Sequence, residues 1–254
     1  MGEWDLYSSP SESIVVSHRS DTDRCQRHGD QNAEDYDEPT SSYLFSHERT
    51  LSDRNGGMGT ERITLGFDES ERMRVGALYW EAFQRKLRPA FADSPTGLRV
   101  VQASLRSERL LVARSAAGSV SGVCGFHEDG TGAVAMTWTT MRGILSVGQS
   151  LRASLVLSLL ARDDEAGALV LDGICVHRDQ RGSGIGTALL DAAEAHARLR
   201  GVGSVSLSVV DGNPRARALY TRRGFVPVSS GALGVLGPIY GFDGYTVMRK
   251  ALVS

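Results

Sequence analysis

Hydrophobic residues follow two different patterns in the last third of the chain. Residues 169–176 form a nearly continuous apolar run, which predicts a buried strand. Residues 204–210 alternate between apolar and polar side chains, with Val205, Leu207 and Val209 on one face, which predicts a strand with one buried face. The segment between the two strands is rich in alanine and leucine and predicts a helix. The turn that joins the first strand to this helix is therefore a candidate binding site.

Upstream, the pattern predicts a folded part that begins near residue 61. Residues 61–65 have the composition of a short strand, and a helix is expected across residues 70–87, because Pro89 disfavours helical backbone at the residue before it. The side chains expected on the buried side of this helix are Met73, Ala77, Leu78, Phe83 and Leu87.

Three more strands are expected further along the chain. Residues 109–114 and 120–126 predict a hairpin, because a turn around Gly118 separates two apolar runs. The hairpin is expected to end at residues 127–130. Residues 245–250 predict the closing strand.

One apolar segment, residues 144–160, lies between the hairpin and the strand at residue 169. Leu151, Leu155 and Leu159 share a helical face, and the segment is too short and too interrupted by Arg152 to span a membrane. We expect an additional amphipathic helix that packs on the sheet. The alternatives are a wall of a substrate pocket or a dimer face, so a homodimer is left open.

Charge divides the chain into two parts. The 254 residues are 41% hydrophobic with a formal net charge of -2, so one substantial core is expected and a nucleic-acid partner is not. Residues 1–60 hold 12 acidic residues and 5 arginines, a net of -7, whereas residues 61–254 hold 18 acidic and 23 basic residues, a net of +5. The first part has almost no apolar periodicity. We therefore expect a disordered acidic tail over residues 1–60 and one domain over residues 61–254.

The tail has no basic start and apolar core of the kind that a secretory signal needs, and Leu6 stands where a myristoylation motif requires Ser or Thr. Cys25, Cys124 and Cys175 are odd in number and unpaired in spacing, which is typical of a reducing compartment. We expect a cytoplasmic protein without a membrane partner. Cys25 and His28 form only half of a zinc motif, so no metal is expected.

The turn at residues 180–187, Gln-Arg-Gly-Ser-Gly-Ile-Gly-Thr, has the composition of an anion-binding loop. Gly182, Gly184 and Gly186 let the backbone turn sharply and approach a ligand without a Cβ in the way. The first N–H groups of the following helix have no internal partner and carry the positive end of its dipole. A pyrophosphate could therefore bind to backbone groups at this turn.

Two other phosphate-binding motifs are excluded by the same residues. A dinucleotide fingerprint would require glycine at position 187 or 189, where Thr187 and Leu189 stand. A P-loop would end in Gly-Lys-Ser or Gly-Lys-Thr, but the only lysines in the chain are Lys86 and Lys250.

A second motif follows the alternating strand. Residues 213–225 contain the spacing Asn-x-x-Ala-x-x-Leu-Tyr-x-x-x-Gly-Phe, which begins at Asn213 and ends at Phe225. The same residues also suit an ordinary capped helix, because Asn213 is a good N-cap, Pro214 a good first residue and Gly224 a good C-terminal stop. The two interpretations are compatible.

Together, the glycine turn and the second motif resemble the GNAT superfamily of N-acetyltransferases. The specific motifs lie in residues 169–225, and the resemblance extends over most of residues 61–254. It implies an α/β fold with a mixed central sheet flanked by helices. It also implies that acetyl-CoA serves as co-substrate and that the acetyl group passes to a primary amine by direct attack.

The resemblance also implies a role for each motif residue. The backbone groups of Ile174, Cys175 and Val176 would bind the pantetheine arm. The pyrophosphate would be held by Arg181, Gly182, Ser183, Gly184, Ile185, Gly186 and Thr187. Asn213 and Tyr220 would flank the thioester, and Tyr220 would assist departure of the CoA thiolate. For Cys175 we expect a buried strand position rather than a nucleophile, and the alternative for Tyr220 is a core tyrosine beside Phe225.

The sequence offers more than one candidate for the group that deprotonates the amine. An ammonium with a pKa near 10.4 is neutral in only about one molecule in two thousand at pH 7, so a base is expected. Asp172, on the strand before the turn, is the first candidate, although it could simply orient a neighbouring turn. His127 and Glu81 are the weaker alternatives.

The acceptor amine is open between an antibiotic, a polyamine, an amino acid, a peptide and a protein lysine. A different class of function also remains, in which the domain senses acyl-CoA or binds a partner without turnover. The presence of Tyr220 favours the enzyme.

Overall fold

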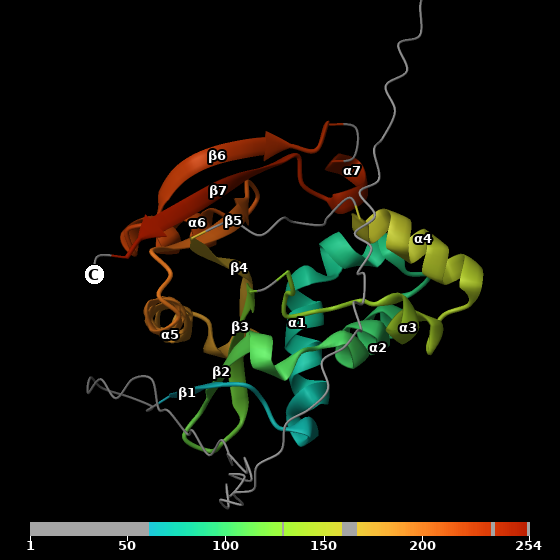
Figure 1. Ribbon diagram of the computed structural model, residues 1–254, viewed down its shortest axis with the longest axis horizontal. Helices are drawn as coiled ribbons and strands as arrows, with labels where there is room; N and C mark the ends of the chain where they lie inside the picture. The colour runs from blue at the N-terminus through green and yellow to red at the C-terminus, as the bar shows by residue number, and fades with distance from the viewer. Residues whose placement is uncertain (1–60, 129, 159–166, 235–236, 253–254) are drawn as a thin grey trace, which may run out of the picture. The chain divides into compact units, whose positions relative to one another are not determined.

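The computed structural model describes residues 61–128, 130–158, 167–234 and 237–252 (Figure 1). The acidic tail expected at residues 1–60 lies outside these ranges, and so do Cys25, His28 and Leu159. No helix within the described ranges is long and apolar enough to cross a membrane.

The described strands form one seven-stranded sheet with the order β1-β2-β3-β4-β5-β7-β6. Its strands are β1 (Arg62–Leu65), β2 (Leu110–Arg114), β3 (Val120–His127), β4 (Ala168–Val176), β5 (Ser204–Val210), β6 (Val226–Ala232) and β7 (Gly244–Ala251). Strands β4 and β5 are parallel, and every other neighbouring pair is antiparallel. The predicted mixed sheet is therefore confirmed.

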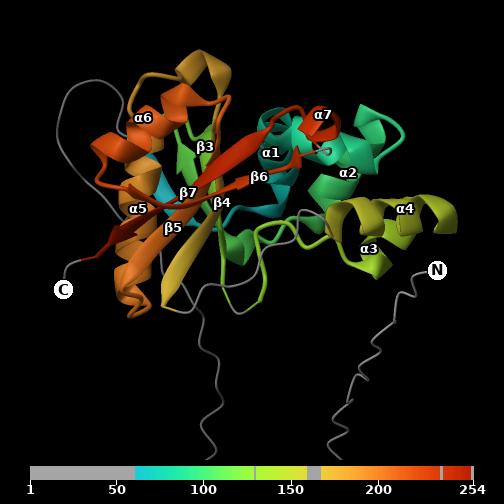
Figure 2. The ribbon, with the colours of Figure 1, turned by 90° about the horizontal axis from the view of Figure 1, so that it is seen from above.

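Helices cover both faces of this sheet. The described helices are α1 (Arg72–Leu87), α2 (Ser94–Ser104), α3 (Trp138–Arg142), α4 (Val147–Ser158), α5 (Ile185–Leu199), α6 (Pro214–Arg222) and α7 (Gly237–Tyr240). Helices α5 and α6 lie over one face, while α1 and α2 lie over the other, where α3, α4 and α7 gather beside them (Figure 2). This is the α/β architecture that the resemblance implies.

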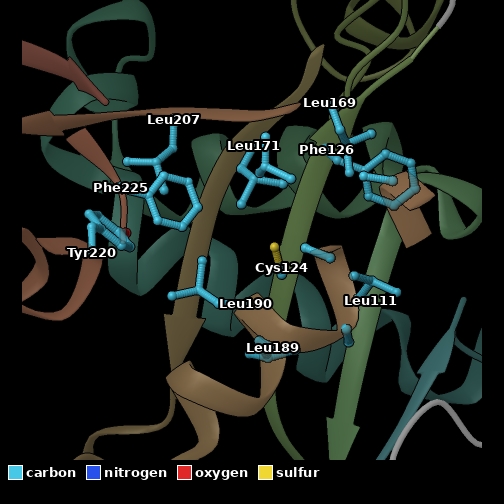
Figure 3. Close-up of a cluster of buried hydrophobic side chains, with 14 of the residues drawn as sticks. Leu111, Cys124, Phe126, Leu169, Leu171, Leu189, Leu190, Leu207, Tyr220 and Phe225 are labelled. Atoms are coloured by element: carbon cyan, nitrogen blue, oxygen red, sulfur yellow. The ribbon is translucent and has the colours of Figure 1, made fainter. Parts of the chain in front are cut away.

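The core under α5 follows from the alternating pattern of β5. Val205, Leu207 and Val209 are all at most 3% exposed, as predicted. They pack with Leu189 and Leu190 of α5 in the cluster that Figure 3 shows. Burial of aliphatic side chains on this scale, about 1.5–3 kcal/mol for each, holds α5 and its N-terminus in place on the sheet.

The buried side of α1 differs from the prediction. Leu78 is buried, and Phe83 and Leu87 pack against a second core cluster, which lies on the side of the sheet that α1 and α2 cover. However, Met73 is 64% exposed and Ala77 is also exposed. The helix is rotated because it packs on α2 through Gly76, where a Cβ would lie 2.3 Å from Cγ of Gln102. The contact between α1 and α2 is therefore made at a glycine and not at a large apolar residue.

The prediction that the leucine face of α4 packs on the sheet is wrong. Leu151 is 58% exposed and Leu155 is 70% exposed, whereas Ser150 and Ala153 are buried. Small side chains let α4 approach α3 and the 3-10 turn Arg88–Ala90 closely, and this contact determines which side faces inward. Neither α2 nor β6 was predicted from the pattern, and β6 is an edge strand that is mostly exposed.

Candidate active site

Strands β4 and β5 pair only over their first four residues. The register runs from Ala168 opposite Ser204 to Leu171 opposite Leu207, and beyond it β4 continues to Val176. In the pairing of β4 with β3, Phe126 lies opposite Leu171 and Gly125 opposite Gly173, so Asp172 is the extra residue of a bulge. A bulge bends its strand, and this one lies where β4 leaves β5. On the side of β5, the backbone of residues 172–176 is therefore not paired with β5.

The side of β4 that faces α1 is covered at the bulge by an aromatic ring. A Cβ on Gly173 would lie 2.0 Å from Cζ of Phe83, so the ring sits directly on the backbone of β4. Glycine is required at this position because of that close approach. The ring of Phe83 also contacts Tyr79, with centroids 4.5 Å apart.

The glycine turn leads from β4 into α5. Gly182 has a φ of 91° and Gly184 a φ of 93°, in the left-handed region that favours glycine, and no atom lies within 4 Å of a Cβ added at either position. The backbone conformation, rather than crowding, is therefore what requires glycine there. The first helical hydrogen bond runs from Ala188 N to Gly184 O at 3.0 Å, so the N–H groups of the three preceding residues are left for a ligand.

Arg181 ties this turn to two other elements. Its Nε donates to the carbonyl of Val176 at 3.1 Å, and its terminal nitrogen lies 3.3 Å from Oε1 of Glu81 on α1. Both side chains are substantially exposed. Glu81 is thus occupied by the turn and is not among the residues that line the cavity described below. This position does not favour Glu81 as the base.

Asn213 caps α6, as the capped-helix interpretation predicts. Its Oδ1 accepts a hydrogen bond from the N–H of Ala216 at 3.1 Å, and Pro214 is the first helical residue. Tyr220 lies seven residues further on, near the end of the helix.

Tyr220 is 8% exposed and packs on Phe225, with ring centroids 6.0 Å apart (Figure 3). The packing alternative for this tyrosine is therefore present in the structure. Burial, with smaller contributions from the thiols of Cys124 and Cys175, raises the pKa of its phenol well above the usual value, so the hydroxyl stays protonated. A protonated hydroxyl can donate a hydrogen bond.

Cys175 is 3% exposed on β4, as expected. Burial raises the pKa of its thiol far above the usual range, which keeps it in the unreactive thiol form. The predicted buried position is confirmed.

A cavity of about 970 Å³ lies on the α1 side of the sheet and reaches both diverging strands. Tyr79, Phe83, Lys86 and Leu87 come from α1, and Val170 and Asp172 come from β4. From β5 the lining includes Ser206 and Ser208, which occupy the polar positions of the alternating pattern. Helix α4 contributes Ser154, Leu157 and Ser158, so this helix lines a cavity. That the cavity receives a substrate stays a prediction.

His127 and Asp172 meet inside this cavity. Nε2 of His127 lies 3.0 Å from Oδ1 of Asp172, and the two side chains are 22% and 12% exposed. The other carboxylate oxygen, Oδ2, accepts a hydrogen bond from the N–H of Ala133 at 2.9 Å. Asp172 therefore orients the turn at Ala133, the simpler role that the sequence left open, and contacts His127 as well.

The sequence missed several residues of this cavity. Phe83 was predicted only as a core side chain, and Lys86, Phe242 and Tyr245 were not singled out. Ser206 and Ser208 could have been found from the sequence. The alternation of β5 puts their side chains on the other face of the sheet from the buried Val205, Leu207 and Val209. The described residues contain no group of three His, Cys, Asp or Glu side chains placed to hold a metal ion.

Comparison with known proteins gives a match to one family and to solved structures. Residues 75–225, more than half of the chain, match the model of the acetyltransferase (GNAT) family. The structure of an N-acetyltransferase from Staphylococcus aureus Mu50 is similar, with a TM-score of 0.53 and 15% identity over 74% of this chain and 99% of that one. A GCN5-related N-acetyltransferase from Kribbella flavida has a TM-score of 0.50 and 17% identity over 76% and 98% of the two chains. The comparison with curated proteins gives no match.

Proposed function

Because the chain belongs to the acetyltransferase (GNAT) family, we propose that it transfers an acetyl group from acetyl-CoA to the primary amine of an acceptor by direct attack. The observation that carries this proposal is that β4 and β5 stop pairing after Leu171 and diverge. The glycine turn lies at the end of β4, Tyr220 packs on the α5 face, and the cavity lies on the α1 face. The two substrates could therefore approach one point from opposite faces of the sheet.

The fit to acetyl-CoA rests on the backbone. The edge of β4 over Ile174, Cys175 and Val176 is available for the amide groups of the pantetheine arm. Residues 181–187 would hold the pyrophosphate, because left-handed Gly182 and Gly184 present the first N–H groups of α5. The positive end of the α5 dipole adds to this attraction. Asn213, at the start of α6, would lie beside the thioester end.

The amine must lose a proton before it attacks. At pH 7 the neutral form of an ordinary alkylamine costs roughly 4.6 kcal/mol. Asp172 and His127 are the groups in the cavity suited to lower this cost. If the pair accepts the proton through His127, the resulting imidazolium lies beside the carboxylate of Asp172, which stabilises it. Asp172 would act as the base directly or as the residue that positions His127.

The reaction then exchanges one bond for another. The amine nitrogen forms a bond to the thioester carbonyl carbon, the carbon–sulfur bond breaks, and the sulfur leaves as a thiolate. Full proton transfer from a phenol to a thiolate is uphill by roughly 2 kcal/mol in water. Since burial raises the pKa of Tyr220 further, we expect its hydroxyl to stabilise the thiolate by a hydrogen bond rather than by complete transfer.

The test is acetyl transfer by the purified full chain. Acetyl-CoA is offered with a panel of amines, thiol release is followed with a disulfide reagent, and the acetylated amine is identified by mass spectrometry. The proposal predicts both signals with at least one amine. Tight binding of acetyl-CoA without any acetylated product would overturn it and favour a domain that senses acyl-CoA.

A further inference from the structure

We infer that the acceptor is a monoamine with an apolar body, and not a polyamine, an aminoglycoside or another polycation. This inference rests on the proposed function, because it assigns the cavity on the α1 face to the acceptor. It concerns the size of the cavity, the nature of its walls and the number of charges in its described lining.

The cavity is large, and apolar residues form the greater part of its lining. Its volume of about 970 Å³ is at the upper end of the range for sites that enclose a whole small molecule. Its apolar lining residues include Met136, Met141, Leu157, Leu233 and Val247. Apolar walls reward an apolar body, because removing that body from water is favourable.

The described lining contains one carboxylate. Asp172 supplies it, and both of its oxygens already have partners, Nε2 of His127 and the N–H of Ala133. Each further ammonium group brought into a cavity needs an acidic partner, because an unpaired buried charge is strongly disfavoured. The described lining therefore suits an acceptor with one amino group.

The cavity also contains a cation. The ammonium of Lys86 lies 5.9 Å from the ring centre of Phe83 and 5.5 Å from that of Phe242, and all three residues line the cavity. A second positive charge on the acceptor would share this cavity with the ammonium of Lys86, and like charges repel each other. The aromatic faces next to it suit a flat or aliphatic apolar body instead.

The wall formed by α4 is held by a specific contact. The hydroxyl of buried Tyr240 on α7 donates to the carbonyl of Val156 on α4 at 3.1 Å. Leu157, which follows Val156, lines the cavity, whereas Leu155 is 70% exposed on the other side of the helix. The same helix thus carries one leucine that lines the cavity and another, two positions away, that is exposed and can serve as a control.

The experiment compares acceptors at equal concentration and pH. We expect kcat/KM for 2-phenylethylamine and hexylamine to exceed that for spermidine and kanamycin by about 100-fold. Equal or faster acetylation of spermidine or kanamycin overturns the inference and leaves the proposed function intact.

Variants connect the preference to the cavity. Leu157→Glu should lower kcat/KM for 2-phenylethylamine by at least about 10-fold with unchanged acetyl-CoA affinity, because it puts a carboxylate in the apolar wall. Leu155→Glu is the matched control and should behave as the wild type. Lys86→Gln should improve spermidine relative to 2-phenylethylamine. An unchanged preference in both Leu157→Glu and Lys86→Gln, with native circular dichroism, contradicts the inference.

If no amine is acetylated, the proposed function fails and binding decides the inference alone. Calorimetry with 2-phenylethylamine and spermidine, in the presence of CoA, then measures what the cavity prefers. Binding of 2-phenylethylamine that Leu157→Glu weakens supports the inference, and its absence or a preference for spermidine overturns it.

Discussion

His127 and Asp172 lie on neighbouring antiparallel strands, and Nε2 of the histidine is 3.0 Å from Oδ1 of the aspartate. The contact follows from the register, because Val170 pairs with His127, and Asp172, two residues further along β4, lines the same cavity. The bulge shifts the alternation after Asp172, so that Gly173 also faces α1. Gly132 packs against the same pair, because a Cβ there would lie 2.4 Å from Nε2 of His127 and 2.6 Å from Oδ2 of Asp172. The pair is therefore enclosed on a side where even a methyl group would clash.

The first prediction concerns this pair. Asp172→Asn keeps the size of the side chain and removes its negative charge, so turnover should fall by roughly 10²-fold, the scale for loss of a base. His127→Gln should cause a similar loss. If the two residues act together, the double variant should be little worse than either single one. Steady-state kinetics measures the three variants, and acetyl-CoA affinity, expected to be unchanged, is the control. Losses that simply multiply contradict a joint role.

The second prediction concerns the glycine turn. Gly184→Val places a β-branched residue at a φ of 93°, which forces the turn to change shape and should weaken acetyl-CoA binding by at least about 10-fold. Gly201→Val is a matched control, because Gly201 also has a positive φ, 70°, and no atom within 4 Å of an added Cβ, but lies beyond the other end of α5. Calorimetry should show a loss of affinity only for Gly184→Val. Equal losses in both variants would mean general destabilisation.

The third prediction concerns Tyr220. Tyr220→Phe keeps the ring that packs on Phe225 and removes the hydroxyl, so turnover should fall by roughly 10²-fold with acetyl-CoA affinity nearly unchanged. The melting temperature should change little, because the ring contacts remain. Undiminished turnover in this variant would reduce Tyr220 to a packing role.

The pH dependence gives a second measurement for the same residue. Because burial raises the pKa of Tyr220 above its usual value of 10, the phenol is protonated throughout the range below pH 10. Loss of the phenolic proton should therefore not reduce kcat/KM as the pH rises to 10. The wild type and Tyr220→Phe should give profiles of the same shape, and a fall near pH 8–9 present only in the wild type would contradict this assignment.

The fourth prediction concerns stability. Arg114 holds Glu71 through hydrogen bonds of 2.7 Å from Nε and 2.6 Å from the terminal nitrogen, and this contact lowers the pKa of Glu71 below its usual value of 4.5. Glu71→Gln should cost about 1.5–3 kcal/mol at pH 7, the range for hydrogen bonds to charged groups. A lowered pKa means that the stabilisation is complete well above pH 4.5 and is lost as the pH falls below it. The difference between the two proteins should therefore shrink at low pH.

Glu69→Gln is the control for this measurement. Glu69 also pairs with an arginine, Arg72, at 2.6 Å, but its side chain is 78% exposed, so solvent screens the interaction. Denaturant unfolding at pH 7 and pH 4 should show a clearly smaller effect for Glu69→Gln. An effect of equal size would show that the partial burial of Glu71 does not matter.

The patterns nearest the motifs were the most informative in the sequence. Four predicted features form as expected: the strands at residues 169–176 and 204–210, the hairpin, and the capped helix after Asn213. Each was predicted from the order of apolar, polar and capping residues within one or two neighbouring elements. The errors lie where packing partners are distant in sequence. Met73 and Leu155 have suitable apolar spacing, but small residues, Gly76 and Ala153, determine which side of each helix is buried.

The sequence by itself determined the family, the glycine turn and the capped helix that carries Tyr220, because each is a local pattern of residues within one or two elements. Only the tertiary structure decided the acceptor side of the site. His127 and Asp172 are joined through the pairing of β3 with β4, and Phe83 reaches Gly173, just after the bulge, from another part of the chain. Strand register, helix rotation and bulges follow from the packing of the whole domain, so a local pattern does not specify them.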